Sequence, residues 1–202
     1  MANRVITISR QFGSGGRTVG RMTAMKLGIP CYDQELIQKV AEESGFAERY
    51  IQERGEEFSS GGWLTAAFTD REYNGLSLQD SLWLAQRNVI LDLAKKGPCV
   101  IVGRCADYIL RDHPELVSVF VHANSDFRAA RIAEEYKLPD AKVRDLLVKT
   151  DKKRANYYNF QSEKQWGAAS SYNLCIESSE VGIDGAVDLI MDYINYKKKA
   201  KG

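Results

Sequence analysis

Two periodicities alternate along the chain. Short runs rich in apolar and β-branched residues occur at 4–9, 29–33, 99–103, 116–123 and 172–177. Three of these runs are apolar at nearly every position, as strands are when helices bury both of their faces. The segments between the runs are longer and carry apolar residues at helical spacing. This order of strand, helix and strand predicts βαβ units, and therefore an α/β fold in which helices cover both faces of a parallel sheet.

The predicted helices have recognisable ends. The first, at about 17–27, stops before Gly28 and Pro30, and the second, at about 34–44, follows Asp33, a residue type that favours the N-cap. Further helices are expected at about 79–96, at 125–136 with Ser125 at its start, from Pro139 onward, and from about 183 to the lysine-rich end.

Two long segments show neither pattern. Residues 45–75 combine several charges with a glycine pair, and residues 150–171 are dense in lysine, arginine, asparagine and aromatic residues. Long irregular segments within a compact domain are usually lids or binding loops. We therefore expect both segments to border a ligand site.

Composition and charge limit the class of protein. The 202 residues suit one domain, and 28 basic against 27 acidic residues give a net charge of +1. This balance argues against a protein that works through general attraction to nucleic acid or to a membrane surface. Apolar stretches of signal-peptide or membrane-span length are missing, so we expect a cytoplasmic location. Any anion site must be local.

The cysteine and histidine residues do not indicate a metal centre. The four cysteines form no CxxC pair and two of them stand in apolar runs, so buried reduced thiols are expected. Neither His113 nor His122 has a second ligand at metal-binding spacing.

A glycine-rich turn, SRQFGSGGRT at 9–18, joins the first predicted strand to the first predicted helix. A loop of the GxxxxGK[ST] kind at such a junction binds phosphate through backbone N–H groups, while its lysine reaches the terminal phosphates and its hydroxyl binds magnesium. Here Arg17 stands at the lysine position and Gln11 at the first glycine. A turn that uses glycine for geometry alone is the alternative. The phosphate-binding candidates are Gly13, Ser14, Gly15, Gly16, Arg17 and Thr18. Arg17 is also a catalytic candidate, and Thr18 is also the candidate metal ligand.

Segments along nearly the whole chain resemble the cytidylate kinase-like family. The resemblance is carried by "ITISRQFGSGGRTVG", "LGIPCYDQELI", "IVGRCADYIL", "VFVHANSDFRAARI", "DKKRANYYNF" and "SSYNLCI". It implies a three-layer α/β/α P-loop NTP hydrolase fold with a five-stranded parallel sheet. It also implies a single kinase domain over 1–202, with an acceptor-binding insertion at about 45–80 and a lid at about 137–170.

The resemblance further implies roles for individual residues. Arg104 corresponds to the arginine that meets the acceptor phosphate in cytidylate kinases, and Asp107 in the same segment is a further substrate-binding candidate. At the edge of the lid, Arg128 is expected to bind ATP and Arg131 to act in the transfer. The pair Asp151 and Arg154 matches the lid's own Asp and Arg, as a substrate-binding and a catalytic candidate. The family's second lid arginine falls near Leu147, so that contact is either missing or supplied by Arg144, Lys149 or Lys153.

Several of these residues also have plainer interpretations. Arg128 and Arg131 suit a solvated helix face, and residues 152–154 suit a simple charge run. The aromatic residues Tyr157, Tyr158, Phe160 and Trp166 favour packing over base stacking. Asp33 is either an N-cap or an active-site residue at the end of the second strand, and Gln34 stands where cytidylate kinases have a CMP-contacting serine.

These observations and the resemblance predict an ATP-dependent phosphotransferase that uses Mg²⁺. The expected acceptor is CMP or dCMP, and the alternatives are a small-metabolite hydroxyl or a nucleotide-binding regulator without turnover. The expected partners are small-molecule nucleotide substrates, without nucleic acid or membrane, and a homo-oligomer is left open.

Overall fold

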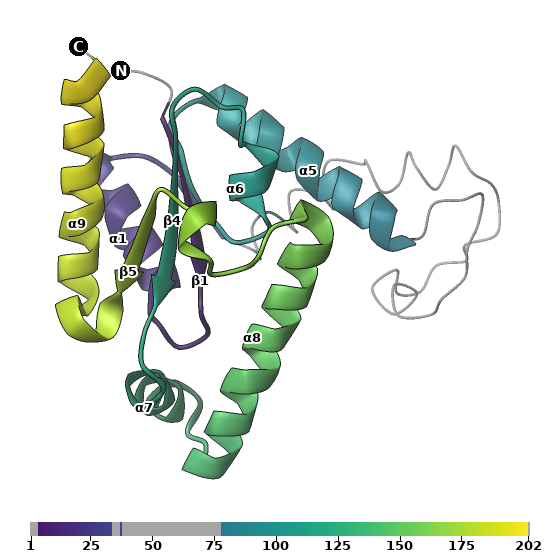
Figure 1. Ribbon diagram of the computed structural model, residues 1–202, viewed down its shortest axis with the longest axis vertical. Helices are drawn as coiled ribbons and strands as arrows, with labels where there is room; N and C mark the ends of the chain where they lie inside the picture. Colours follow the sequence, from purple (N-terminus) through teal and green to yellow (C-terminus); the bar gives the residue numbers. More distant parts are fainter. Residues whose placement is uncertain (1–3, 34–36, 38–77, 202) are drawn as a thin grey trace.

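A five-stranded parallel sheet in the order β2-β3-β1-β4-β5 forms the centre of the computed structural model, which describes residues 4–33, 37 and 78–201 (Figure 1). Every predicted strand is present. The strands are β1 (Val5–Arg10), β2 (Cys31–Tyr32), β3 (Cys99–Val102), β4 (Leu116–His122) and β5 (Leu174–Glu177).

Helices cover both faces of this sheet, so the predicted three-layer α/β/α fold is confirmed (Figure 1). Successive strand residues point to opposite faces. Ile6 and Ile8 of β1 therefore join the core beneath α1 (Gly16–Leu27) and α9 (Ser178–Lys201). On the other face Val5 packs with residues of α5 (Leu78–Lys96) and α6 (Ala106–Ile109).

The carboxyl ends of the parallel strands meet at one edge of the sheet. β1 pairs with β3 through Ile8 and Val102, and with β4 through Arg10 and Val121. The residues that follow β1 and β3 are therefore neighbours in space. In open α/β sheets this is the edge at which ligands bind.

Two further helices extend from this edge. They are α7 (Ser125–Tyr136) and α8 (Asp140–Ser162), and they pack on each other through Ala129, Ile132, Val143 and Leu147 (Figure 1). The prediction of an irregular segment at 150–171 is wrong over 150–162, which continues α8. No glycine or proline interrupts residues 140–162, so polar composition was a poor guide to the backbone there.

Smaller differences concern the ends of elements. The N-cap of α7 is Asn124, whose side chain accepts a hydrogen bond from the Phe127 N–H at 2.8 Å, and Ser125 is the first helical residue. The helix predicted from about 183 is confirmed: α9 has non-helical backbone at Gly182, and a short helical turn from Ser178, which was not predicted, precedes this break. The short helix α6 was not predicted, because four residues show no period. The 3-10 helix η1 (Ala169–Ser171) precedes β5.

All four cysteines are free, as predicted, but they are not all buried. Cys99 and Cys105 are buried and Cys31 is half-buried, whereas Cys175 on the edge strand β5 is exposed. Apart from Ile37, the predicted helix at 34–44 lies outside the described residues, as does the predicted insertion up to residue 77. None of the helices within the described ranges is long and apolar enough to cross a bilayer.

Candidate active site

The glycine turn folds into a tight loop between β1 and α1. Gly13 and Gly15 have φ of 80° and 78°, in the left-handed region that favours glycine. A Cβ built on Gly13 would lie 2.8 Å from the carbonyl oxygen of Arg128, so the loop also needs glycine for close approach. The helix begins at Gly16, and its first N–H groups have no acceptor within the helix. This is the backbone arrangement that suits a phosphate group.

The side chain of Ser14 braces the loop from inside. It is fully buried, and its Oγ lies 2.9 Å from the carbonyl oxygen of Gln11 and 3.0 Å from that of Val121. The hydroxyl of Ser178 donates to the carbonyl oxygen of Ser14 at 2.7 Å. The hydroxyl of Ser14 is therefore used within the protein, and its N–H makes a long hydrogen bond of 3.4 Å to the carbonyl oxygen of Gln11. Thr18, by contrast, is exposed in the first turn of α1, where a magnesium ligand is expected.

Arg17 leaves α1 toward the end of β2. Its Nε and Nη2 donate to Oδ2 of Asp33 at 3.0 and 2.7 Å, and Arg21 donates to the same oxygen at 3.0 Å. The Ile37 N–H bonds to the backbone carbonyl of Asp33 at 2.9 Å. The structure thus brings together Arg17, which the sequence indicated as a phosphate-binding residue, and Asp33, which it indicated as an N-cap or a substrate-binding residue.

A second set of contacts ties the loop to α7 and α8. Asp151 of α8 accepts a hydrogen bond from the Phe12 N–H at 2.7 Å through Oδ1 and forms an ion pair with Arg128 through Oδ2. Arg128 also donates to the Phe12 carbonyl at 3.3 Å. Both carboxylate oxygens of Asp151 are therefore engaged within the protein. The plain interpretation of Arg128 as a solvated helix residue is wrong.

Arg131 lies directly beside the glycine turn. A Cβ built on Gly15 would be 3.6 Å from both Cζ and Nη2 of Arg131. This arginine comes from α7, so the loop is approached by cations of a segment that is distant in sequence. Its predicted part in the transfer stays a prediction, but its location agrees with it.

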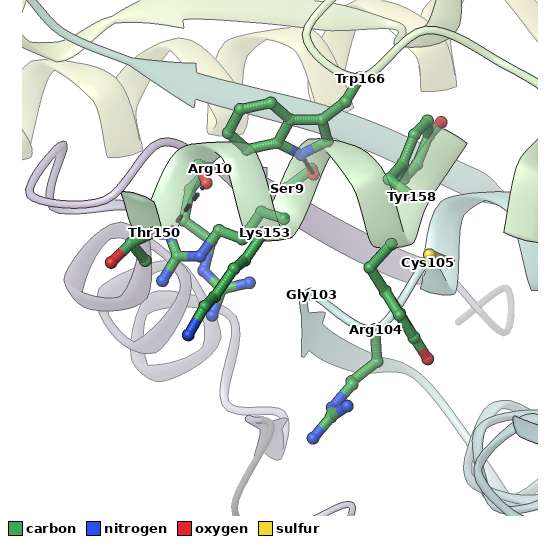
Figure 2. Close-up of a pocket in the computed structure, with 11 residues that line it drawn as sticks. Ser9, Arg10, Gly103, Arg104, Cys105, Thr150, Lys153, Tyr158 and Trp166 are labelled. Carbon is green, nitrogen blue, oxygen red and sulfur yellow. Dashed lines mark hydrogen bonds between the residues drawn. The ribbon is translucent and has the colours of Figure 1, made fainter. Parts of the chain in front are cut away.

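A pocket of about 330 Å³ opens between the end of β1, the end of β3 and α8 (Figure 2). Eleven residues line it: Ser9, Arg10, Gly103, Arg104, Cys105, Thr150, Lys153, Arg154, Tyr157, Tyr158 and Trp166. Figure 2 shows the charged ends of Arg104 and Lys153 directed to the same open side of the pocket. The four cationic members and the lack of any Asp or Glu in the lining make this a site for an anion.

Arg10 is surrounded by other positive charges. Burial, followed by the nearby positive charges of Arg154, Arg104 and Arg17, lowers the pKa of Arg10 to about 9. Arg154 donates from Nη1 to the carbonyl oxygen of Arg10 at 3.1 Å, and burial also lowers the pKa of Arg154. A bound phosphate would neutralise this crowding, so the residues present fit a polyphosphate.

Arg104 is held in the pocket by an unusual backbone. Gly103, Arg104 and Cys105 have φ of 84°, 57° and 53°, three consecutive residues in the left-handed region. Such conformations cost of order 1–2 kcal/mol for residues other than glycine. Within the part of the chain that the structure describes, the buried Nε of Arg104 has no hydrogen-bond partner. Strain and an unsatisfied donor together indicate a ligand-binding arginine.

Asp107 lies beneath the pocket rather than in it. It is 8% exposed and accepts a hydrogen bond from the Tyr158 hydroxyl at 2.7 Å. Burial raises the pKa of Asp107 above its ordinary value. Its predicted contact with substrate stays a prediction, since in this structure Asp107 supports a residue of the pocket wall.

The aromatic residues divide into two groups, those that pack at the pocket and one that is exposed. Tyr158 is buried against Tyr172, and Trp166 packs edge-on against Phe120 while its Nε1 donates to Ser9 Oγ at 3.2 Å. These contacts confirm the packing interpretation for both residues, which also line the pocket with Tyr157. Phe160 is 78% exposed, so packing was the wrong expectation there.

The position of the expected second lid arginine is apolar. Leu147 is buried between α7 and α8. Arg144 pairs with Asp126 at 2.9 Å, and Lys149 pairs with Asp145 at 2.6 Å. Lys153 lines the pocket. Among the three substitutes considered, Lys153 is the one in position.

Arg10 is the site residue that sequence reasoning missed. The predicted strand ended at Ser9 and the loop motif was placed from Gln11 onward, so Arg10 fell between the two. A charged residue that ends an otherwise apolar buried strand, directly before a glycine turn, was the available signal.

Comparison with known proteins agrees with this geometry. A sequence model of the Cytidylate kinase-like family matches residues 5–180. The chain is 26% identical over 196 residues to a protein named cytidylate kinase from Pyrobaculum islandicum, with 94% of this chain and 92% of the relative covered. A cytidylate kinase from Pyrobaculum aerophilum is 24% identical over 192 residues, with 94% and 91% covered.

Solved structures extend the comparison. An uncharacterized protein from Eubacterium ventriosum is 30% identical, with a TM-score of 0.75 and with 95% of this chain and 98% of that chain covered. Shikimate kinase from Bacteroides thetaiotaomicron has a TM-score of 0.55 at 17% identity, with 95% and 98% covered. At that identity the second likeness concerns the fold alone.

Proposed function

The chain belongs to the cytidylate kinase-like family, and we propose that it transfers the γ-phosphoryl group of ATP to the phosphate of a nucleoside monophosphate, with CMP or dCMP as the first candidate. Its relatives from Pyrobaculum are named cytidylate kinase. The donor would bind at the glycine turn and the acceptor phosphate at Arg104.

The observation that carries this proposal is the unneutralised positive charge of the pocket. Two carboxylates near the loop are already engaged, Asp33 with Arg17 and Arg21, and Asp151 with Arg128. The lining arginines and Lys153 face no carboxylate in the pocket wall. Phosphoryl transfer requires this kind of environment, because its transition state spreads negative charge over the equatorial oxygens of the transferred group.

In the transfer, an oxygen of the acceptor phosphate forms a bond to the γ-phosphorus, the bond from that phosphorus to the β,γ-bridging oxygen breaks, and ADP leaves with the electron pair. The chain's part is to position the reactants and to stabilise charge. Arg104 would hold the acceptor, while Arg131 and Arg154 would approach the transferred group from α7 and α8. Arg17, Asp33 and Asp107 would act at the edges of the site.

Asp151 and Arg128 would work through the loop. They hold the backbone of Phe12, next to Gly13, and so fix the turn that receives the ATP phosphates. We assign them a positioning role in place of direct contact with substrate.

The exposed Thr18 hydroxyl would help to hold magnesium, which would supply positive charge to neutralise the charge that develops on the leaving group. Among the described residues, no group of three or more His, Cys, Asp or Glu side chains is arranged so that it could hold a metal ion. The remaining ligands would therefore be phosphate oxygens and water, as magnesium commonly prefers.

The runner-up acceptor is the hydroxyl group of a small metabolite, which would need a general base. Asp33 is the candidate base, but its carboxylate is shared between two arginines. A nucleotide-binding regulator without turnover is the third alternative.

Steady ATP consumption by the purified protein separates these cases. Consumption that begins on addition of CMP or dCMP supports the proposal, whereas consumption with an alcohol acceptor alone favours the runner-up. ATP binding without consumption for any acceptor favours the regulator.

A further inference from the structure

We infer that Arg10, at the end of β1, is the cation that binds the terminal phosphates of the donor nucleotide. It would replace the lysine of a GxxxxGK loop whose lysine position is residue 16, one residue earlier than the register that the sequence first indicated. This inference rests on the proposed use of ATP at the glycine turn. It concerns a residue outside the span 13–18 that the motif indicated.

The first argument is the space around Gly16. A Cβ built on Gly16 would lie 2.5 Å from Cβ of Arg10 and 3.0 Å from its Cγ, with Cβ of Val121 at 3.3 Å. Real Cβ atoms essentially never approach another atom as closely as the first of these distances, and the other two are tighter than most real contacts. The stem of Arg10 therefore fills the direction in which a side chain at position 16 would leave the helix.

The second argument is where Arg10 ends. A Cβ built on Gly103 would lie 2.2 Å from Nη1 and 3.1 Å from Cζ of Arg10, so the guanidinium lies against the backbone of Gly103. The side chain thus runs from the start of α1 to the end of β3 and lines the pocket beside Arg104. A phosphate held by the loop and an acceptor held by Arg104 would meet next to it.

The third argument is charge. Among the residues that the structure describes, no carboxylate forms an ion pair with Arg10, whereas the charge of Arg17 is met by Asp33. Burial and then the charges of Arg154, Arg104 and Arg17 lower its pKa to about 9, and the more distant carboxylate of Asp33 offsets only part of this shift. A buried cation in a cluster of cations is unfavourable without an anion. The guanidinium also offers the forked donors that suit phosphate.

The sequence register agrees with this assignment. Residues 10–16 read RQFGSGG, and exchange of the first residue for glycine and the last for lysine gives GQFGSGK, a complete GxxxxGK. In this register the final glycine of the motif is Gly15, which is the N-cap of α1, and the lysine position is the first helical residue. The arginine and the glycine have in effect exchanged positions. In this register Arg17 follows the lysine position by one residue, so its side chain leaves the helix in a different direction, and it bonds to Asp33.

Nucleotide binding by single variants tests the inference. The non-hydrolysable analogue AMP-PNP, with Mg²⁺, and AMP are titrated calorimetrically into wild type, Arg10→Met and Arg17→Met. Methionine keeps most of the apolar stem between Gly16 and Gly103. Arg10→Met should weaken AMP-PNP binding about 10- to 100-fold, the loss expected for a charged hydrogen bond, and leave AMP binding unchanged. Arg10→Lys should recover most of the loss.

Arg4→Met is the matched control, because Arg4 precedes the other end of the same strand and pairs with Glu115. It should bind AMP-PNP as wild type does. Equal binding by Arg10→Met and wild type would overturn the inference, as would a larger loss for Arg17→Met. Failure of the proposed function looks different, since wild type itself would then not bind AMP-PNP, or would bind it and transfer no phosphoryl group from ATP.

The exchange of positions gives a second test. Arg10→Gly should bind AMP-PNP weakly, and Gly16→Lys should lower the melting temperature because the lysine collides with Arg10. The double variant Arg10→Gly with Gly16→Lys should fold and bind AMP-PNP within a few-fold of wild type. A double variant that binds no better than Arg10→Gly contradicts the inference. One that does not fold also contradicts it, because the space left by Arg10 should accept the lysine.

Discussion

Arg17 of α1 and Asp33 at the end of β2 are joined by two hydrogen bonds to a single carboxylate oxygen, at 3.0 Å from Nε and 2.7 Å from Nη2. Arg21 reaches the same oxygen at 3.0 Å. A carboxylate held by two arginines is a weak base and a good structural anchor. This favours a phosphate acceptor, which needs no proton removed, over an alcohol.

Asp33→Asn should therefore keep most of the maximal rate. The amide preserves one acceptor oxygen for the arginines, and a monophosphate acceptor requires no general base. Steady-state kinetics with CMP and ATP measure the effect. A loss of about 10²–10⁴-fold in kcat, the usual contribution of a general base, would instead assign Asp33 to an alcohol substrate.

Arg104→Gly should separate stability from function. Glycine adopts the φ of 57° found at this position without strain. Relief of about 1–2 kcal/mol of strain exceeds the roughly 0.4–1 kcal/mol that the freedom of glycine in the unfolded chain costs, so the free energy of unfolding should rise by up to about 1 kcal/mol. The Michaelis constant for the acceptor should rise at least about tenfold, since one charged contact to phosphate is lost, while that for ATP changes little. Urea unfolding and two-substrate kinetics give both values.

Lys137→Gly is the control for that variant. Lys137 is the C-cap of α7, with a φ of 54° and an exposed side chain. It should gain similar stability without any change in kinetics. An Arg104→Gly protein with unchanged acceptor kinetics would remove Arg104 from the acceptor site.

Asp151→Asn should loosen the loop. One oxygen of Asp151 receives the Phe12 N–H and the other pairs with Arg128, and hydrogen bonds to charged groups contribute about 1.5–3 kcal/mol. We expect a loss of unfolding free energy in that range together with weaker ATP binding. Asp145→Asn, which removes an exposed pair with Lys149 on the same helix, should cost about 0.5 kcal/mol or less. Equal costs for the two variants would show that Asp151 does not brace the turn.

Arg10→Met should make the unliganded protein more stable at pH 7. The folded-state pKa of about 9 lies below the ordinary 12.5, so the folded protein disfavours the charged form. This cost is complete below pH 9 and disappears between pH 9 and 12.5. Removal of the charge should raise the melting temperature, by about 2–4 °C for each kcal/mol at this chain length. Arg4→Met, which breaks a pair with Glu115, should lower it. A lower melting temperature for Arg10→Met would mean that its charge is already satisfied.

The sheet was predictable because its strands are buried on both faces. Continuous apolar runs such as 99–103 and 116–123 leave little choice of structure, and glycine or proline marks several helix ends. The segment 150–162 was not predictable in this way. Its helix is stabilised by contacts that only the fold creates, including Asp151 with Arg128 and Tyr158 with Asp107.

The candidate site was predicted in part. Gly13 and Gly15 have the positive φ that a glycine turn at this junction predicts, because backbone requirements restrict the residue type. The phosphate-binding roles of these glycines and of Arg104 stay predictions. The partners of Arg17 and Asp151 could not be read from sequence, since each pair joins residues of different elements. The place of Arg10 in the site was not predicted, because its side chain occupies space that is open only where Gly16 and Gly103 lack side chains.

Transfer of label from [γ-³²P]ATP tests the central claim most directly. Wild-type protein with Mg²⁺, labelled ATP and CMP or dCMP should place the label on the β-phosphate of the corresponding diphosphate, and Arg104→Gly should do so only at raised acceptor concentration. Label that appears solely as inorganic phosphate, or on an alcohol offered in place of the nucleotide, would contradict the account.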